Sequence, residues 1–362
     1  DVMPAIGTHF PMAEPELRRM FGTSIPLDAY KQHRWREDLV RLGQVPAEFV
    51  HQASEGVLQD VMPDYDIPVE INRRLTEGGY TALLSVGQVV PHEVVGMANG
   101  FKNVLVGTGG QETIHRTHFL GAVYGMERMM GRAETPVRAV LNYAHDHFLS
   151  DLGIVYILTV VTPDEEGSPV LKGLYVGDDH ETFLQAAELS RRVNVTLLDQ
   201  PVDRVVAYLD PGEFRSTWLG NKAVYRTRMM IADGGELTVV APGVETFGED
   251  PQIDRLIRRY GYCGTPAVLE AVSEDDALCA NLSAAAHLIH GSSEDRFSIV
   301  YATDPARLSR QEVEAVGYRW RDVGDVFRAH DTVDLKPGPN EGFYFVRNPA
   351  LGLWAARDRF PD

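Results

Sequence analysis

The chain contains little cysteine and little lysine, and it has no long apolar run. Cys263 and Cys279 are the only cysteines among 362 residues, which excludes a disulfide framework and a metal site built from cysteines. No run of about 18 apolar residues occurs, so we expect no membrane-spanning helix. Together these absences favour a cytoplasmic protein.

Positive charge is also scarce. The chain has 34 lysines and arginines against 52 acidic residues, and its formal net charge is −18. Nucleic acid or an anionic membrane would require a basic patch, so neither is an expected partner. A small-molecule substrate is the default expectation, and the length predicts two domains.

The scarcity of lysine draws attention to one segment, residues 85–118. Only five of the 34 basic residues are lysines, and Lys102 lies here between glycines and histidines. His92 follows a proline at the end of an apolar run, and His115 and His118 follow a glycine-rich turn. A buried lysine can lose its proton and form a covalent bond, which arginine cannot do.

Apolar runs and helical patterns alternate along the chain, which predicts an α/β fold with mainly parallel, Rossmann-like sheets. We expect strands at 80–86, 103–106, 156–161, 171–176, 204–208, 236–240, 297–301 and 342–347, and a strand around 145–147. We expect helices at 13–21, 46–58, 69–79, 94–100, 111–130, 179–192, 217–231, 252–260, 266–272, 277–290 and 309–317. A boundary near 195–200 separates residues 1–195 from residues 200–362, and the abrupt start predicts a further upstream part.

The turn Gly107–Gly110 permits a second interpretation. Gly107 and Gly109 resemble half of a dinucleotide-binding fingerprint if a strand precedes them, although Glu112 occupies the third glycine position. His115 and His118 are three residues apart on one helix and could share a zinc ion, but zinc catalysis needs a third ligand. His145 and His147 are expected to be structural.

Several motifs resemble the nickel-pincer nucleotide-dependent lactate racemase family, whose central pattern is roughly P-H-x3-G-x-S-G-G-x-K. Pro91-His92, the segment from Gly96 to Lys102, and His118 match this pattern in spacing. Residues 7–12 resemble the G-T-H-x-P motif of the family, residues 68–73 its P-V-x-x-N stretch, and residues 204–223 the opening of its second domain.

The resemblance implies two α/β domains with the active site in the cleft between them, and an isomerase acting on a 2-hydroxy acid. It implies a cofactor of the pyridinium-3,5-bisthiocarboxylic acid mononucleotide type, attached covalently to Lys102, with nickel bound by His118. Lys222 matches a further lysine of the site. His9 and His92 would be the acid and base on opposite faces of the substrate, while hydride moves between Cα and the cofactor. Proteins of cofactor biosynthesis would be partners.

The departures from the family pattern concern the surroundings of the cofactor and substrate. Ala98 and Asn99 replace its serine and glycine, Leu219 replaces a glutamine, and Leu282 replaces a tryptophan. An upstream D-x-T-R-P segment, which would bind the substrate carboxylate, is absent from these residues. We therefore expect a racemase or epimerase of lactate or of a larger 2-hydroxy acid such as a sugar acid.

Two other functions remain open. The first is a zinc- or nucleotide-dependent enzyme that uses His115, His118 and the turn Gly107–Gly110. The second is a catalytically silent binding protein on the same fold.

Overall fold

The structure, a computed structural model, describes residues 1–164, 168–329 and 335–360. The chain forms two compact units. Unit 1 comprises residues 1–120 and 132–190, and unit 2 comprises residues 121–131 and 191–362. In the described part of the chain, no helix combines the length and the apolar character that crossing a membrane requires.

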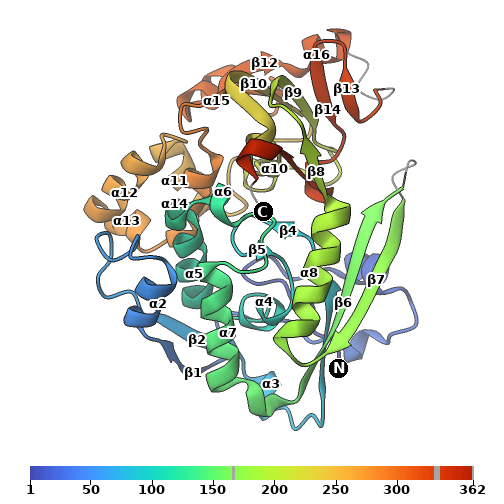
Figure 1. The fold of residues 1–362 in the computed structure, drawn as a ribbon, viewed down its shortest axis with the longest axis vertical. Helices are drawn as coiled ribbons and strands as arrows, with labels where there is room; N and C mark the ends of the chain where they lie inside the picture. The colour runs from blue at the N-terminus through green and yellow to red at the C-terminus, as the bar shows by residue number, and fades with distance from the viewer. Residues whose placement is uncertain (165–167, 330–334, 361–362) are drawn as a thin grey trace. The chain divides into compact units, whose positions relative to one another are not determined.

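Unit 2 is built on a six-stranded sheet in the order β12-β11-β10-β9-β14-β13 (Figure 1). All neighbouring strands except the antiparallel edge pair β13–β14 are parallel. The strands are β9 Val202–Tyr208, β10 Ile231–Ala241, β11 Ser298–Thr303, β12 Arg319–Asp322, β13 Gly338–Asn340 and β14 Phe343–Val346. The three central strands carry runs of buried Val, Leu and Ala, because helices cover both faces of such a sheet.

Helices alternate with these strands as the sequence predicts. They are α9 Thr217–Gly220, α10 Lys222–Thr227, α11 Pro251–Tyr260, α12 Thr265–Glu274, α13 Asp276–Cys279, α14 Leu282–Gly291, α15 Arg310–Ala315 and α16 Val323–Ala329. A separate parallel pair joins β8 Val195–Leu198 to β15 Leu353–Ala356. The α/β class and the mainly parallel sheet are thus confirmed in this unit.

Unit 1 combines smaller sheets with helices. The described residues form the antiparallel pairs β1 Leu39–Val45 with β2 Ile67–Asn72 and β4 Pro91–His92 with β5 Gly96–Met97. A three-stranded sheet joins β3 Leu83–Gln88, β6 Ile154–Pro163 and β7 Pro169–Gly177, in which β3–β6 is the parallel pair. The helices are α1 Glu14–Phe21, α2 Ala47–Ala53, α3 Arg74–Glu77, α4 Phe101–Leu105, α5 Gln111–Tyr124, α6 Met126–Met129, α7 Pro136–Phe148 and α8 His180–Asn194.

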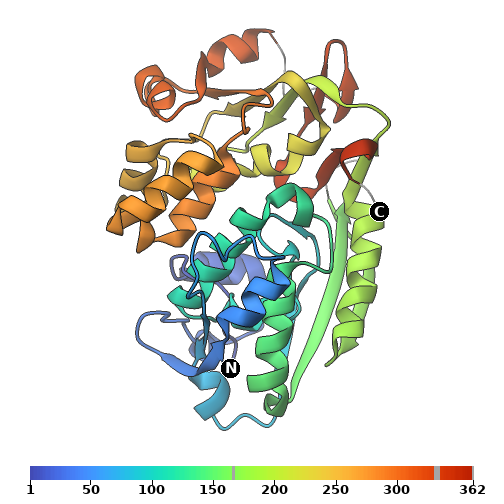
Figure 2. The same ribbon diagram turned by 60° about the vertical axis from the view of Figure 1, so that its left-hand side comes forward.

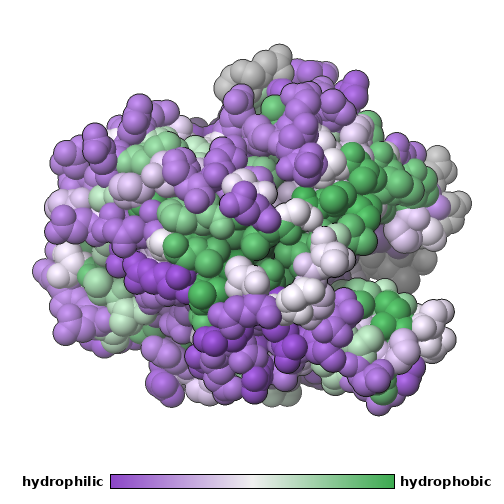
Figure 3. Space-filling view, turned by 90° about the horizontal axis from the view of Figure 1, so that it is seen from below, coloured by the Kyte–Doolittle hydropathy of each residue, from purple (hydrophilic) through white to green (hydrophobic). Residues whose placement is uncertain are grey.

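The sheet β3-β6-β7 has one covered and one open face. Helix α8 runs along β6 and β7 in both ribbon views (Figure 2), and a Cβ at Gly173 would lie 2.5 Å from the Leu189 side chain. The strand register places five exposed apolar side chains on the opposite face: Leu84, Val86, Leu171, Leu174 and Val176. Hydrophobic surface also forms a continuous area on the side of the molecule displayed in Figure 3.

Four local predictions in unit 1 are wrong. Residues 103–106, predicted as a strand, belong to α4 and its end, and residues 94–100 form β5 and a loop instead of a helix. Residues 67–72, the start of the predicted helix 69–79, pair with β1 as strand β2. Residues 145–147 lie in helix α7 instead of a strand, because Val137, Val140, Leu141 and Ala144 form one buried helical stripe.

Candidate active site

Lys102 lies in the first turn of α4, just after a loop with unusual backbone geometry. Gly96, Asn99 and Gly100 all have positive φ, at 82°, 69° and 61°. Asparagine is the residue that best tolerates this conformation after glycine, so Asn99 can occupy a glycine position of the family motif. The loop leads directly to the half-buried Lys102 at the start of a short helix.

His92 ends the two-residue strand β4, which pairs with β5 across a tight hairpin. The backbone N–H of Val94 donates to Nδ1 of His92 at 3.1 Å. An amide can only donate, so Nδ1 must be the unprotonated nitrogen and the neutral ring carries its proton on Nε2. In this arrangement His92 can donate a hydrogen bond from Nε2.

His118 has the opposite tautomer. It lies on α5, and its Nδ1 contacts the carbonyl oxygen of Ile114 at 2.7 Å. A carbonyl can only accept, so Nδ1–H donates and Nε2 keeps its lone pair. Metal-binding histidines commonly have this second hydrogen bond to a carbonyl, which fixes the ring and its tautomer. His118 thus has the chemistry of a metal ligand at Nε2.

His9 follows a turn at Gly7 that lies against the segments carrying Lys102 and His118. Gly7 N–H donates to the carbonyl of Gly107 at 2.7 Å, and the Gly7 Cβ position lies 3.7 Å from Cδ1 of Ile114. Gly107 itself closes α4, since its N–H donates to the carbonyl of Lys102 at 3.1 Å. Short contacts thus join the His9 loop to the helix of Lys102 and to the helix of His118, while His9 itself is exposed.

The turn Gly107–Gly110 serves as a structural connection. Helix α4 precedes it, so the strand-turn-helix arrangement of a dinucleotide site is absent and that interpretation is wrong. Strand β2 holds the turn through Gly110 N–H to the Glu70 carbonyl, at 3.0 Å. The buried His33 adds a bond from Nε2 to the Gly109 carbonyl at 3.0 Å. Sequence reasoning missed His33, because nothing in its local sequence distinguishes it.

The remaining histidines of unit 1 have structural surroundings. His115 is buried, and burial lowers the pKa of its imidazole below the usual value. His145 stacks on Phe101 with ring centroids 3.7 Å apart, and His147 donates to the Tyr143 carbonyl. Within the described ranges no three histidine, cysteine, aspartate or glutamate side chains are grouped to hold a metal. A zinc site based on His115 and His118 therefore has no support.

Lys222 lies in unit 2, at the start of α10, and is half-buried. The preceding Asn221 is fully buried and has its side-chain amide fixed on both sides. Tyr301 donates to Asn221 Oδ1 at 2.8 Å, and Asn221 Nδ2 donates to the Tyr318 hydroxyl at 3.0 Å. The Tyr318 hydroxyl donates in turn to the Gly291 carbonyl at 2.9 Å. This buried network holds the start of the lysine's helix.

A second buried network lies beside the first, since the rings of Tyr262 and Tyr318 stack with their centroids 4.4 Å apart. Thr217 donates to the Phe247 carbonyl at 3.0 Å and therefore accepts from Tyr262, 2.9 Å away. His287 contacts the Tyr262 hydroxyl through Nε2 at 2.9 Å and the Tyr225 hydroxyl through Nδ1 at 2.8 Å. Since Tyr262 uses its proton on Thr217, Nε2 of neutral His287 carries a proton and Nδ1 accepts. Sequence reasoning missed both networks.

Comparisons with known proteins agree with this architecture. Residues 1–130 match the family model of the lactate racemase N-terminal domain. No curated protein sequence matches the chain. A crystal structure of a Thermotoga maritima protein is similar with a TM-score of 0.81 and 25% sequence identity, over 98% of this chain and 85% of that one.

A lactate racemase apoprotein from Thermoanaerobacterium thermosaccharolyticum has the same fold. Its TM-score is 0.70 with 14% sequence identity, over 97% of this chain and 77% of that one. Residues 1–130 are therefore similar to the lactate racemase N-terminal domain, and the chain shares its fold with this apoprotein.

Proposed function

We propose that the chain is a racemase or epimerase of a 2-hydroxy acid that uses a nickel-pincer nucleotide attached to Lys102. The observation that carries the proposal is the tautomer of His118, whose Nδ1–H is held by the Ile114 carbonyl. An imidazole whose Nδ1–H is fixed in this way suits nickel, for which imidazole is a common ligand at the other ring nitrogen. The contacts between the His9 loop, α4 and α5 support a shared site in unit 1.

The proposed roles follow from the chemistry of each residue. The bound group would supply a hydride acceptor, which the reaction needs because the Cα–H bond of a hydroxy acid is too weakly acidic for histidine to ionise. Lys102 would supply the amine of the covalent attachment and His118 the metal-binding nitrogen. Lys222 would be a further cofactor-binding residue.

Two histidines would handle the hydroxyl proton. Imidazole exchanges protons near neutral pH and can act in both directions. His92 would act as the acid in its imidazolium form, with a proton on each nitrogen, because a neutral ring that lost its Nε2 proton would become an imidazolate; His9 would begin as the base. The imidazolium and the neutral ring with a free Nε2 both carry a proton on Nδ1, so in either direction His92 would have to release the Val94 amide.

Intact-mass measurement tests the attachment. The full chain would be produced together with the proteins that make the cofactor, and we expect an adduct on Lys102 and about one nickel per chain, because one lysine and one histidine define one site. Lys102→Arg should abolish the adduct, because arginine cannot be acylated in this way. Lys172→Arg, on the exposed strand β7, is the matched control and should keep it.

An active preparation with unmodified Lys102 would contradict the covalent attachment. Racemisation assays over 2-hydroxy acids of increasing size, from lactate to sugar acids, would then identify the substrate. A loaded protein with no turnover on any of them would favour the silent binding protein.

A further inference from the structure

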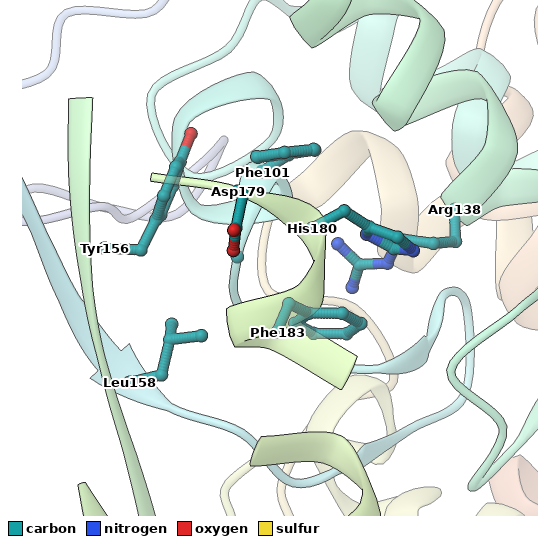
Figure 4. A pocket seen from close by; sticks show the side chains of 8 residues that line it. Phe101, Arg138, Tyr156, Leu158, Asp179, His180 and Phe183 are labelled. Atoms are coloured by element: carbon teal, nitrogen blue, oxygen red, sulfur yellow. The ribbon is translucent and has the colours of Figure 1, made fainter. Parts of the chain in front are cut away.

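Helix α7 contacts the loop before Lys102 through a buried arginine. Arg138 is only 1% exposed. Its Nη2 donates to the Met97 carbonyl at 2.6 Å, and its Nη1 donates to the Asn99 carbonyl at 3.1 Å. The close-up in Figure 4 shows the guanidinium beside the ring of Phe183, whose centroid is 3.9 Å from the guanidinium carbon.

The buried guanidinium of Arg138 binds backbone carbonyls instead of a carboxylate. Arg138 forms no ion pair with any residue that the structure describes, and its Nε has no hydrogen-bond partner there. Burial lowers the pKa of the guanidinium to about 9, so it stays charged at neutral pH. Burying such a charge is costly, and an apolar side chain of similar size would fill this space at lower cost. The two carbonyl contacts are therefore the specific contribution of this side chain.

The loop that Arg138 contacts needs external support. Three of its five residues have positive φ, and Gly96 and Met97 pair with β4. Beyond this pairing, Ala98 N–H donates to the Val90 carbonyl, Gly100 N–H donates to Oδ1 of Asn99, and the Gly100 carbonyl accepts from Asn103 N–H. The charge-assisted bonds from Arg138 bind the carbonyls on both sides of Ala98. Without them the left-handed conformation of Asn99, which is the one non-glycine residue of the three, would lose part of its support.

A second side chain of α7 supports the residue after the loop. His145 lies seven residues, or two turns, after Arg138 and so on the same face of the helix. Its ring stacks on Phe101 at an interplanar angle of 4°. On the other side, a Cβ at Gly100 would lie 2.9 Å from the Phe183 ring, which leaves no room for the loop to move toward α8.

We propose that Arg138 is a positioning residue that holds the loop 96–100 and thereby fixes where Lys102 stands for attachment of the cofactor. The claim about cofactor attachment rests on the proposed function, whereas the claim that Arg138 holds the loop does not. Arg138 acts through the backbone and touches neither substrate nor cofactor in this scheme.

Hydrogen–deuterium exchange of the full chain tests whether Arg138 holds the loop 96–100 in place. The fraction of chains with an adduct on Lys102 tests whether this loop positions Lys102 for attachment. In Arg138→Met we expect the amides of residues 94–106 to exchange about tenfold faster, because two charge-assisted hydrogen bonds are lost. Arg138→Lys should give a smaller increase, since an ammonium group can still bind one carbonyl. Both variants should lower the adduct fraction, the Met variant more strongly.

Arg73→Met is the matched control, because Arg73 also donates to a backbone carbonyl, that of Leu39 at 2.9 Å, outside the loop. It should leave exchange in 94–106 unchanged. Exchange in that segment within about twofold of wild type in both Arg138 variants would overturn the proposal. If Arg138→Met does not fold, the exchange of residues 94–106 in Arg138→Lys tests the proposal. If wild type carries no adduct, the proposed function fails, and the exchange data still decide whether Arg138 holds the loop.

Discussion

At the scale of single residues, the backbone decides which nitrogen of each site histidine is protonated. A backbone amide donates to Nδ1 of His92, and a backbone carbonyl accepts from Nδ1 of His118. Identical side chains therefore present opposite chemistry at Nε2, a proton in one case and a lone pair in the other. The motif spacing predicted both histidines as site residues, but it could not predict their tautomers, because Val94 and Ile114 contribute only main-chain atoms.

Asn99 provides a residue-scale prediction about the loop before Lys102. Its φ of 69° disfavours a side chain with no local hydrogen bond. We expect Asn99→Ala to lower the free energy of unfolding by about 1–2 kcal/mol, the cost of the left-handed conformation. Asn99→Gly should be close to neutral, because glycine adopts this conformation freely and restores the family residue. Urea denaturation of the two variants measures the difference, and equal stabilities would contradict the account.

At the scale of elements, the prediction from sequence succeeded where periodicity was long and failed where elements were short. The strands β9, β10, β11 and β14 of unit 2 and most of its helices were predicted, because each has a buried run or an amphipathic face, whereas the short strands β8, β12, β13 and β15 and helix α16 were missed. Helix α4 has only five residues, too few to show a period, and its apolar Val104 and Leu105 resembled a strand. Helix α7 could have been predicted, because its apolar residues have a helical spacing that the two histidines obscured.

The same limitation applies to the buried polar contacts of unit 2. Asn221, Tyr301 and Tyr318 are far apart in the sequence, and no local pattern reveals that they meet. Burial raises the pKa of both tyrosine hydroxyls well above the usual value, so they remain protonated donors. Such contacts follow only from the complete fold.

Asn221 provides an element-scale prediction. Replacing it with alanine leaves the Tyr301 donor without its acceptor and the Tyr318 hydroxyl without the donor it accepts from. We expect Asn221→Ala to lower the unfolding free energy by about 2–3 kcal/mol, the cost of leaving buried polar groups unsatisfied. The control is Asn340→Ala, whose side chain bonds only to nearby carbonyls in the loop before β14 and should change stability little. Similar losses in both variants, by chemical denaturation, would argue against this role of the network.

At the scale of the whole molecule, buried histidines make stability depend on pH. His33, His115 and His180 each have a lowered pKa, caused first by burial. In the unfolded chain their pKa is near the ordinary value of 6.5. Between the lowered value and 6.5, the unfolded chain binds more protons than the folded protein does. Each of these histidines therefore lowers the free energy of unfolding as the pH falls below 6.5, and it has no such effect above that pH, where the ring is neutral in both states.

We expect the free energy of unfolding to fall when the pH is lowered from 7 to 5, with a slope of up to about 1.4 kcal/mol per pH unit for each such histidine. His33→Gln removes one of these groups and should reduce the slope while lowering stability at neutral pH. Denaturant titrations at several pH values measure both. A stability that stays constant or increases on acidification would contradict the prediction.

The bond between Asn99 and Gly100 also sets a limit on the chemical lifetime of the protein. Gly100 N lies 2.8 Å from Oδ1 of Asn99, so the main-chain nitrogen stands beside the side-chain carbonyl group that it attacks when asparagine loses ammonia. Asparagine is for this reason among the thermolabile residues. Slow ageing at this bond would convert residue 99 to aspartate or isoaspartate, placing a new negative charge beside Arg138 and, in the second case, lengthening the main chain three residues before Lys102.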